Sequence, residues 1–366
     1  MSILFTPCKL GSLTVRNRFV RSATCEGMCN AAGDVTPALV RYCERVARGG
    51  VGLFITGHTF VHPSGKASQG MMGACRDEQI PGLAQLASRV KTAGAAIAVQ
   101  LNHGGRQCRS EIIGQTPLAP SAVTDRSSGI TPRALTEAEI GEIIASYVAA
   151  AVRAKRAGFD AVQLHCAHGY LMSEFISPYT NRRTDRWGGS LENRARFILE
   201  VLRACRRELG RQYPIFIKLN GEDFIEGGLQ LADTVEFAKM LEADGIAAIE
   251  VSGAMAESVG MVMRKNITAA EDEAYFLRHV EAVRKAVRVP LLCVGGLRSR
   301  QVMERIVGSG SAEFVSMSRP FIRQPDLPEL MRQGKLDRAS CVSCNRCKKD
   351  AEEGLQCALD AEAAEK

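Results

Sequence analysis

Residues 215–251 read IFIKLNGEDFIEGGLQLADTVEFAKMLEADGIAAIEV, and this stretch contains the pattern that decides the fold. Its two ends, Ile215 to Leu219 and Ala247 to Val251, are short apolar runs of the kind that form buried parallel strands. Leu231 to Ala243 between them has amphipathic, helical spacing, and Gly245 follows as a helix-stop signal. The stretch therefore predicts a strand, a helix and a second strand in one βαβ unit.

The same unit recurs along the chain. Further apolar runs predict strands at Phe19 to Thr24, Leu53 to Thr56, Ala96 to Leu101, Ala161 to His165, Leu291 to Val294 and Phe314 to Met317. Further amphipathic stretches predict helices at Pro37 to Arg48, Ile80 to Ala93, Glu137 to Ala157, Glu192 to Leu209, Glu271 to Ala286 and Arg300 to Val307. Eight strands that alternate with helices predict an α/β protein with a (β/α)8 (TIM) barrel. A doubly wound sheet is the alternative, but it needs a glycine-rich turn after its first strand, and residues 22–27 do not form one.

The two ends of the chain are expected to add to the barrel. Leu4 to Val15 is predicted to form an N-terminal hairpin that plugs the barrel floor, and Phe321 to Leu336 a closing helix. The barrel domain then comprises residues 1–336, and residues 337–366 form a cysteine-rich C-terminal extension. Its last part, Ala351 to Lys366, is rich in alanine and glutamate and is expected to fray, apart from the stretch around Cys357.

The composition excludes several classes of protein. With 46% hydrophobic and 24% charged residues in a chain of 366, it is globular. No run of about eighteen apolar residues occurs, so we expect no membrane span, and the N-terminus lacks the apolar core of a secretory signal. The 47 Lys and Arg are scattered among 40 Asp and Glu, which argues against nucleic-acid binding. Thirteen cysteines without a secretory signal favour a reduced, cytoplasmic setting over a disulfide framework.

Polar residues and glycines gather where the predicted strands end, which is where (β/α)8 barrels carry their chemistry. After the first six strands these residues include Ser22, Thr24, Cys25, Gly57, Gln100, His165, Lys218, Ser252 and Gly253. Gly295 and Gly296 end the seventh strand, and Ser318 and Arg319 the eighth, which together predict a phosphate site. The ammonium of Lys218 inside a barrel needs a negative partner, and a ligand that becomes anionic would supply one.

His165, His168 and Tyr170 lie close together after the fourth strand. Two imidazoles and a phenol at a barrel mouth suggest donors that polarise a carbonyl group and deliver a proton. The His-x-x-His spacing could instead chelate a metal ion, although no carboxylate completes a third ligand nearby in the sequence.

Taken together, these motifs resemble the old yellow enzyme family of FMN-dependent ene-reductases, from Leu4 to about Cys357. The motifs that carry the resemblance are Val15 to Arg18, Gln100 to Arg106, His165 to Leu171, Phe175 to Ser190 and Ser318 to Pro320. The long segment Phe175 to Ser190 is the strongest signature among them. The resemblance implies that residues 1–336 form an FMN-binding barrel.

The resemblance also implies a role for each matching residue. Ser22, Ala23 and Thr24 would lie against the isoalloxazine, Gln100 would bind its pyrimidine edge, and Lys218 would face N1 and O2. Gly295, Gly296, Ser318 and Arg319 would hold the phosphate, while His165 and His168 would bind the substrate's activating oxygen and Tyr170 would donate a proton. Cys25 or Thr24 would lie beside N5. Because neighbouring residues on a strand point to opposite sides, we expect one of the two to face the flavin, and we favour Cys25.

The implied reaction is a ping-pong reduction of an activated C=C bond in an α,β-unsaturated carbonyl or enoyl-type substrate, with NAD(P)H as co-substrate. An amine-type dehydrogenase that runs the flavin in the oxidative direction is one alternative. An electron-transfer subunit of a larger flavin and iron–sulfur complex is another, and it would take electrons from a donor protein. By analogy we expect an even-numbered homo-oligomer.

Four cysteines, Cys341, Cys344, Cys347 and Cys357, have the spacing of iron–sulfur or zinc ligands. They resemble the cluster motif of the dienoyl-CoA reductase and trimethylamine dehydrogenase branch, including Asn345 after the second cysteine. This implies a [4Fe–4S] cluster, with zinc or no metal as alternatives. Members of that branch carry a further FAD- and nucleotide-binding half, which we expect to be missing here or to belong to another polypeptide.

Overall fold

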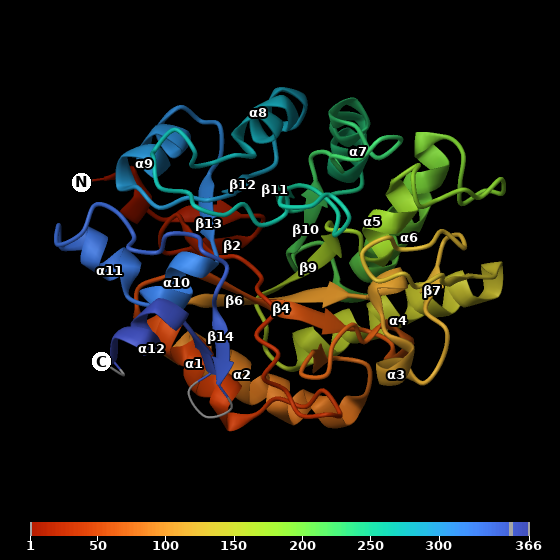
Figure 1. The fold of residues 1–366 in the computed structure, drawn as a ribbon, viewed down its shortest axis with the longest axis horizontal. Coiled ribbons are helices and arrows are strands. Elements are labelled where there is room, and N and C mark those ends of the chain that lie inside the picture. Colours follow the sequence, from red (N-terminus) through yellow and green to blue (C-terminus); the bar gives the residue numbers. More distant parts are fainter. Residues whose placement is uncertain (1, 351–353, 365–366) are drawn as a thin grey trace.

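The computed structural model describes residues 2–350 and 354–364, and its centre is a closed barrel of eight parallel strands (Figure 1). Around the ring the order is β3-β13-β12-β11-β10-β9-β6-β4, and pairing of β3 with β4 closes it. The eight strands are β3 (Phe19–Arg21), β4 (Leu53–Phe60), β6 (Ala96–Asn102), β9 (Ala161–Cys166), β10 (Ile215–Asn220), β11 (Ile249–Ser252), β12 (Leu291–Val294) and β13 (Phe314–Met317). The predicted (β/α)8 barrel is confirmed, and the doubly wound alternative is excluded by the closing pair.

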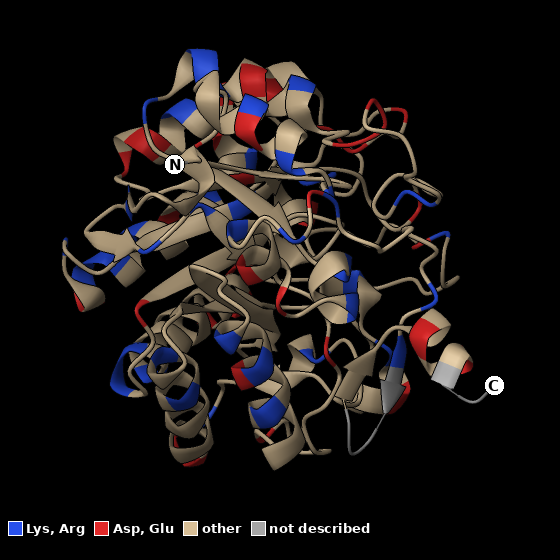
Figure 2. Ribbon diagram, turned by 90° about the vertical axis from the view of Figure 1, so that its left-hand side faces the viewer, with Lys and Arg blue, Asp and Glu red and all other residues tan. Residues whose placement is uncertain are grey.

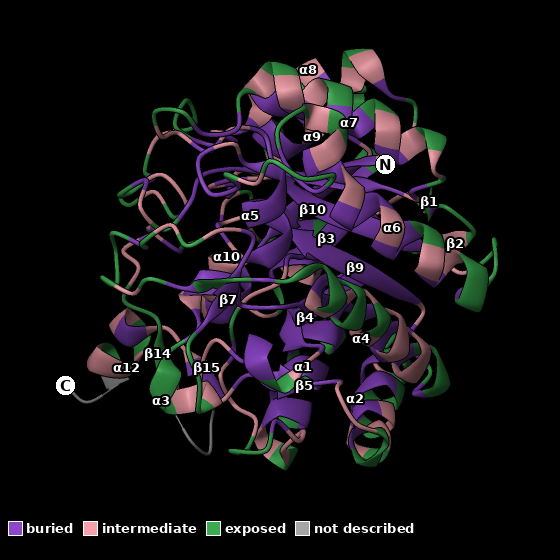
Figure 3. Cartoon of the chain, turned by 90° about the vertical axis from the view of Figure 1, so that its right-hand side faces the viewer, coloured by how far each residue is buried: buried purple, intermediate pink, exposed green. Residues whose placement is uncertain are grey.

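Helices surround the barrel and bury one face each against it. They are α1 (Pro37–Arg48), α2 (Ile80–Thr92), α4 (Glu137–Arg156), α6 (Leu191–Leu209), α7 (Leu231–Ala243), α8 (Leu277–Ala286) and α9 (Arg300–Gly308). Local signals begin them: Thr36 caps α1, and Thr136 with Glu139 forms a capping box at α4. Figure 3 shows buried strands at the centre and exposed residues on the outer faces of the helices. In Figure 2, Lys and Arg are interspersed with Asp and Glu along these outer helices.

The barrel interior begins with an apolar floor. The hairpin of β1 (Cys8–Leu10) and β2 (Leu13–Val15) closes this floor, because its fully buried Leu10 and Val15 pack against the inward-facing side chains. Those side chains are Val20, Leu53, Ile55, Ala98, Ala161, Phe216, Ala248, Leu292 and Phe314. The predicted hairpin plug is thus observed.

Short elements lie in the loops between strands and helices. They are η1 (Ile3–Phe5), η2 (Pro63–Gly65), β5 (Met72–Gly73), η3 (Asp77–Gln79), η4 (Gly105–Gln107), α3 (Ser110–Ile113), β7 (Leu118–Ala119), β8 (Arg133–Ala134) and α5 (Leu171–Ile176). Of these, η4 and α5 follow barrel strands β6 and β9 and help to form the rim of the site. Within the part of the chain that the structure covers, no helix combines the length and apolar character needed to cross a membrane.

The C-terminal region differs from the sequence-based expectation. Instead of one closing helix over Phe321 to Leu336 there are two short ones, α10 (Arg319–Arg323) and α11 (Leu327–Arg332), and Pro325 and Pro328 lie at the break between them.

A hairpin of β14 (Lys348–Asp350) and β15 (Gly354–Gln356) and a final helix α12 (Ala358–Ala364) follow. The prediction excepted the stretch around Cys357 from fraying, but fraying is wrong for α12, where Asp360 pairs with Arg323 at 2.7 Å. Residues 351–353 and 365–366 lie outside the described part.

Candidate active site

A cavity of about 560 Å³ opens at the carboxyl ends of the barrel strands, within the range of about 300–1,000 Å³ typical of ligand sites. Fourteen residues that the sequence predicted for the site line this cavity. They are Ser22, Ala23, Thr24, Cys25, Gln100, His165, His168, Tyr170, Lys218, Ser252, Gly295, Gly296, Ser318 and Arg319. Gly57 and Gly253, which were also predicted, do not line it.

A buried polar layer forms the base of the cavity, above the apolar floor. Its members are Ser22, directly after β3, and Gln100, Gln163, Lys218, Glu250 and Ser316 on β6, β9, β10, β11 and β13. On those five strands each member is two residues beyond a floor residue, and because inward-facing residues recur with a period of two, the floor and the layer share one face of these strands. The change from apolar to polar residues therefore marks where the packed core ends and the site begins.

Glu250 is the centre of that layer, and the sequence reasoning missed it. Its carboxylate accepts hydrogen bonds of 2.7 Å from Ser22, Ser316 and Gln163, and lies 3.4 Å from Nζ of Lys218. Burial lowers the pKa of Lys218 and the Glu250 carboxylate opposes that effect. The negative partner expected for Lys218 is thus supplied by the chain itself. A glutamate within the apolar run Ala247 to Val251 was the signal that could have revealed it.

Gln100 and Lys218 connect this layer to the cavity. Gln100 donates to Gln163 at 2.7 Å, and Lys218 donates to the hydroxyl of Ser22 at 2.8 Å. Both side chains are almost fully buried and still line the cavity. They present polar groups in fixed positions to whatever occupies it, as an electrostatically preorganised site requires.

His165 and His168 stand side by side above that layer, with ring centroids 5.4 Å apart, and the Tyr170 ring lies 4.9 Å from His165. Burial lowers the pKa of His165 well below its ordinary value, and burial with Lys218 and His58 nearby lowers that of His168 to about 3. Both imidazoles are therefore neutral at pH 7, each with one N–H donor. Nδ1 of His165 is buried with no hydrogen-bond partner in the described residues, so its hydrogen-bonding capacity is unused there.

The backbone of His168 is held in an uncommon conformation, with φ of 63°. Its N–H donates to Asn220, its carbonyl accepts from Gln107 at 2.7 Å, and its ring Nε2 lies 2.8 Å from the hydroxyl of Ser252. Residues in this region of φ persist where neighbours fix them, and they gather at functional sites. Four contacts, with the ends of β10 and β11, with η4 and, through a bridge, with Met255, thus fix the position of this residue.

Tyr170 and His58 complete this side of the cavity, with rings 5.1 Å apart. Burial raises the pKa of Tyr170 well above its ordinary value, so its hydroxyl keeps its proton throughout the neutral range. His58 comes from β4, which continues to Phe60 beyond its predicted end at Thr56 after a register shift between Ile55 and His58.

Thr24 and Cys25 both line the cavity, and the strand alternation that underlay the choice between them does not hold there. That choice assumed a strand through residue 24, but β3 ends at Arg21, so strand alternation does not apply beyond it. The Thr24 hydroxyl lies 2.7 Å from that of Ser318, towards the end of β13, and Cys25 lies on the side of His58.

The two glycines outside the lining have structural roles. A Cβ added at Gly57 would lie 2.0 Å from the carboxylate of Glu26. This carboxylate accepts a hydrogen bond from the N–H of Gly57 and pairs with the buried Arg21 at 2.8 Å. A Cβ at Gly253 would lie 2.6 Å from the ring of Phe276, which does line the cavity. Both glycines let the cavity wall pack closely behind the site.

The far end of the cavity has the features of an anion cradle. Gly295 and Gly296 have φ of 124° and 71°, conformations that favour glycine. A Cβ on Gly296 would meet the Tyr275 ring at 2.9 Å, and Ser318 and Arg319 face the same end. Free backbone N–H groups beside an arginine fork suit a phosphate.

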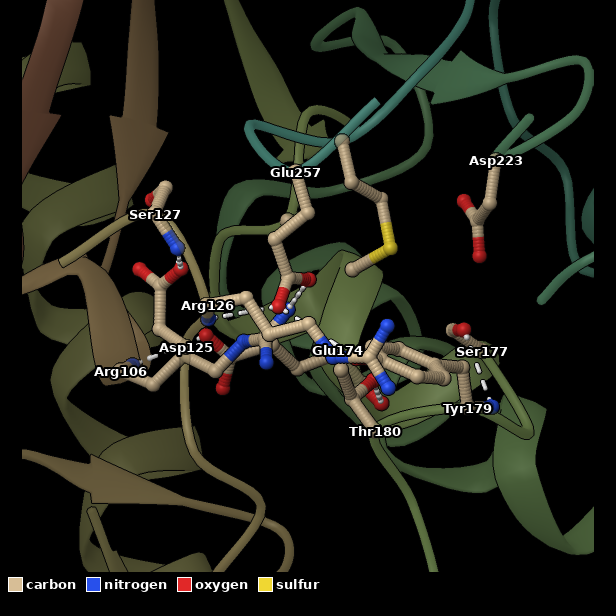
Figure 4. A network of polar contacts seen from close by, with 12 residues as sticks. Arg106, Asp125, Arg126, Ser127, Glu174, Ser177, Tyr179, Thr180, Asp223 and Glu257 are labelled. Carbon is tan, nitrogen blue, oxygen red and sulfur yellow. Dashed lines mark hydrogen bonds and ion pairs between the residues drawn. The ribbon is translucent and has the colours of Figure 1, made fainter. Parts of the chain in front are cut away.

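A buried network fixes the loops around the mouth (Figure 4). Glu257, from the β11–α8 loop, pairs with Arg106 at 2.5 Å, and both side chains are at most 3% exposed. The same carboxylate accepts from the N–H of Arg126 at 2.8 Å and from the Tyr179 hydroxyl at 3.4 Å. The Arg106 N–H donates to Glu174, so one network joins the loops that follow β6, β9 and β11.

The four tail cysteines, Cys341, Cys344, Cys347 and Cys357, line one small hollow of about 10 Å³, which we call the cysteine hollow. Four thiols are the donor set that iron–sulfur clusters use. Among the described residues, however, no three His, Cys, Asp or Glu side chains are close enough to hold a metal ion. The distances between these side chains therefore do not support the predicted cluster or zinc ion. They do not support a metal ion at His165 and His168 either.

The cavity fits an FMN-type ligand by the chemistry of its walls. A buried lysine and glutamine at one end suit a polar ring edge, and two glycines with an arginine at the other suit a phosphate. Between these ends, the segment from Ser22 to Cys25 lines the cavity.

Comparison with known proteins agrees with this geometry. The family model described as NADH:flavin oxidoreductase / NADH oxidase matches residues 3–338. The chain is 38% identical to an NADH oxidase of Thermoanaerobacter brockii, over 93% of this chain and 52% of that protein. It is 35% identical to an NADPH dehydrogenase of Geobacillus thermodenitrificans, over 89% and 93% respectively. A structure of 2-naphthoyl-CoA reductase with 2-naphthoyl-CoA superimposes with a TM-score of 0.87 at 31% identity, covering 92% of this chain and 53% of that one.

The chain thus spans about half the length of the NADH oxidase and the 2-naphthoyl-CoA reductase. The match to the family model extends over the whole barrel, from the N-terminal hairpin to the residues beyond α11. As its resemblance to the old yellow enzymes predicted, the chain belongs to the NADH:flavin oxidoreductase / NADH oxidase family.

Proposed function

We propose that this chain is an FMN-dependent oxidoreductase that takes hydride from NAD(P)H and reduces the activated C=C bond of an α,β-unsaturated carbonyl or enoyl-type substrate. The observation that carries the proposal is the pair of neutral imidazoles, His165 and His168, beside the Tyr170 hydroxyl at the cavity mouth. Membership of the family supports the flavin and the nicotinamide. The likeness to 2-naphthoyl-CoA reductase supports a substrate with an acyl or carbonyl group.

FMN would be held at both ends of the cavity. Gln100 and Lys218 would bind the polar edge of its ring, while Gly295, Gly296 and Arg319 would hold its phosphate. When bound and reduced by NAD(P)H, FMN would supply the hydride that the reaction transfers. The buried pair of Lys218 and Glu250 keeps a positive charge at the ring edge with its counter-charge in the layer below.

The histidines would bind and polarise the substrate. A neutral imidazole offers one N–H to a carbonyl oxygen, and two such donors stabilise negative charge that develops there. The contacts that fix His168 mean that little reorganisation is needed as the charge forms. Tyr170 would hold the proton for the neighbouring carbon at its hydroxyl oxygen, because its raised pKa keeps it protonated.

Replacement of both histidines tests this role. In His165→Ala with His168→Ala, FMN stays bound and reduction of 2-cyclohexen-1-one falls by about two orders of magnitude or more, the scale of lost oxyanion donors. His62→Ala is the control, because His62 is a half-buried histidine outside the cavity lining. Unchanged turnover in the double variant would remove the carbonyl-binding role.

One observation favours a second candidate, an electron-transfer role in a larger complex. The cysteine hollow and the cofactor cavity share Arg319 and Asn345, so a redox group held by the cysteines would lie next to the flavin. On this second reading the cysteines bind a [4Fe–4S] cluster and a donor protein feeds it. Iron and zinc analysis of the chain purified without oxygen tests this, with Cys344→Ala expected to lose iron and keep flavin.

An even-numbered homo-oligomer and a cytoplasmic location remain predictions.

A further inference from the structure

We propose that Asn345, in the cysteine-rich tail, is a positioning residue that holds Arg319 in place for the phosphate of the cofactor. The inference deepens the proposed function, because it rests on FMN with its phosphate at the Gly295–Gly296 end of the cavity. It assigns the tail a part in cofactor binding that is independent of any metal bound by its cysteines.

Hydrogen bonds connect three segments through this one side chain. Nη1 of Arg319 donates to Oδ1 of Asn345 and, at 2.9 Å, to the carbonyl of Arg264. Nδ2 of Asn345 donates to the carbonyl of Met263 at 2.8 Å. The amide of Asn345 thus ties the start of α10 and the β11–α8 loop to the tail, and it holds the Nη1 group of the guanidinium.

The placement of Arg319 leaves it able to bind an anion. It lines both the cofactor cavity and the cysteine hollow, so it stands in the wall between them. A guanidinium has five N–H donors in a rigid fork. In Arg319, Nη1 donates to Asn345 of the tail and to Arg264 of the β11–α8 loop, and the side chain also lines the cavity. The oxygens that Nη1 reaches belong to an amide and a backbone carbonyl, both neutral, so its contacts there leave the positive charge uncompensated.

An asparagine also suits the backbone at this position. Asn345 has φ of 59°, a left-handed conformation that asparagine and glycine adopt more readily than other residues. The same tail segment is joined to the loop through the N–H of Asn266, which donates to the carbonyl of Ser343. Asn266 has φ of 55° and is exposed, so it matches Asn345 in backbone but does not reach Arg319 through its amide.

The test compares Asn345→Gly with Asn266→Gly in the full chain after removal of flavin. Glycine removes each amide without backbone strain, because both positions have positive φ. Dissociation constants for FMN and for riboflavin, which lacks the phosphate, are measured by quenching of flavin fluorescence. We expect Asn345→Gly to weaken FMN about tenfold, the scale of one charge-assisted hydrogen bond, and to leave riboflavin binding unchanged. Asn266→Gly should leave both constants as in the wild type.

A double-mutant cycle separates positioning from general loosening of the tail. In Arg319→Met, FMN binding is already weak, and adding Asn345→Gly should weaken it no further. Loss of FMN and riboflavin affinity by the same factor, or a full tenfold effect in the Arg319→Met background, would overturn the proposal. A wild-type chain that binds FMN no better than riboflavin would instead refute the phosphate site and, with it, that part of the proposed function.

Discussion

At the scale of single residues, the site pairs neutral imidazoles with a buried charge pair beneath them. Burial beside Lys218 keeps His165 and His168 uncharged, so each offers a hydrogen bond rather than a full positive charge. Glu250 balances Lys218, so this ammonium does not need a ligand in order to be buried. This arrangement favours a neutral carbonyl group at the mouth and a polar ring edge below it.

Glu174 gives a residue-scale prediction about pH. It is fully buried, it accepts from the N–H of Arg106, and burial raises its pKa to about 8. Between its ordinary pKa of about 4.5 and about 8, the folded chain holds a proton that the unfolded chain has lost. The free energy of unfolding therefore falls as pH rises through this window and stops falling above it.

Glu174→Gln removes that titration. Relative to the wild type, the variant should gain a few kcal/mol of stability between pH 5 and pH 8, with no further gain above pH 8. Urea unfolding at pH 5, 6.5, 8 and 9 measures the difference. A difference that does not change with pH would show that Glu174 is ionised in the folded chain throughout.

The individual site residues differ in how far the sequence could reveal them. His165 lies at the end of a recognisable strand and His168 and Tyr170 follow it, so their position at the mouth could be predicted. Glu250 could not be placed, because its position beside Lys218 depends on the register in which β11 pairs with β10. That both Thr24 and Cys25 line the cavity could not be predicted, because it depends on where β3 ends, and strand ends are set by pairing rather than by composition.

At the scale of elements, the β11–α8 loop joins the cavity wall to the buried network around Arg106. It supplies Ala256 and Ser258 to the cavity lining, while Glu257 between them points away from the cavity into the network of Arg106. Arg106 is followed by Gln107, whose amide holds the carbonyl of His168. The position of the loop and that of a site histidine are therefore linked through adjacent residues.

Glu257→Gln tests this link. It keeps the shape of the side chain but leaves the buried guanidinium of Arg106 without this charge partner, at a cost of about 3 kcal/mol. We expect a lower melting temperature, a higher KM for 2-cyclohexen-1-one and faster trypsin cleavage after Lys265, which is exposed on the same loop. Glu329→Gln is the control, since its pair with Arg332 is on the surface and contributes at most about 1 kcal/mol. Equal behaviour of the two variants would contradict a role for Glu257 in holding the loop.

Most elements of the barrel could be predicted because each has its own periodic pattern. The bounds of α1 and α7 agree with the prediction, as do those of β12 and β13. Where the pattern is weak the prediction failed: α8 begins at Leu277 rather than Glu271, and α11 begins after Pro325. The tail could not be predicted from its composition, because β15 of its hairpin packs against α1 and α10, and α12 is joined to α10 by the ion pair of Asp360 with Arg323.

At the scale of the whole molecule, the barrel and the tail form one cofactor site. The apolar floor and the N-terminal hairpin close one end of the barrel, the polar layer forms the base of the cavity, and the tail completes its wall through Asn345. The chain spans about half the length of its longer relatives, such as the NADH oxidase. The NADPH dehydrogenase of Geobacillus thermodenitrificans, by contrast, is about as long as this chain.

The measurement that tests the central claim most directly is an anaerobic visible spectrum of the purified chain with FMN, followed through two additions. We predict flavin absorbance that a stoichiometric amount of NADH or NADPH bleaches, and that 2-cyclohexen-1-one then restores without oxygen. Reduced flavin that the enone fails to reoxidise, or a chain that does not bind FMN at all, would contradict the account.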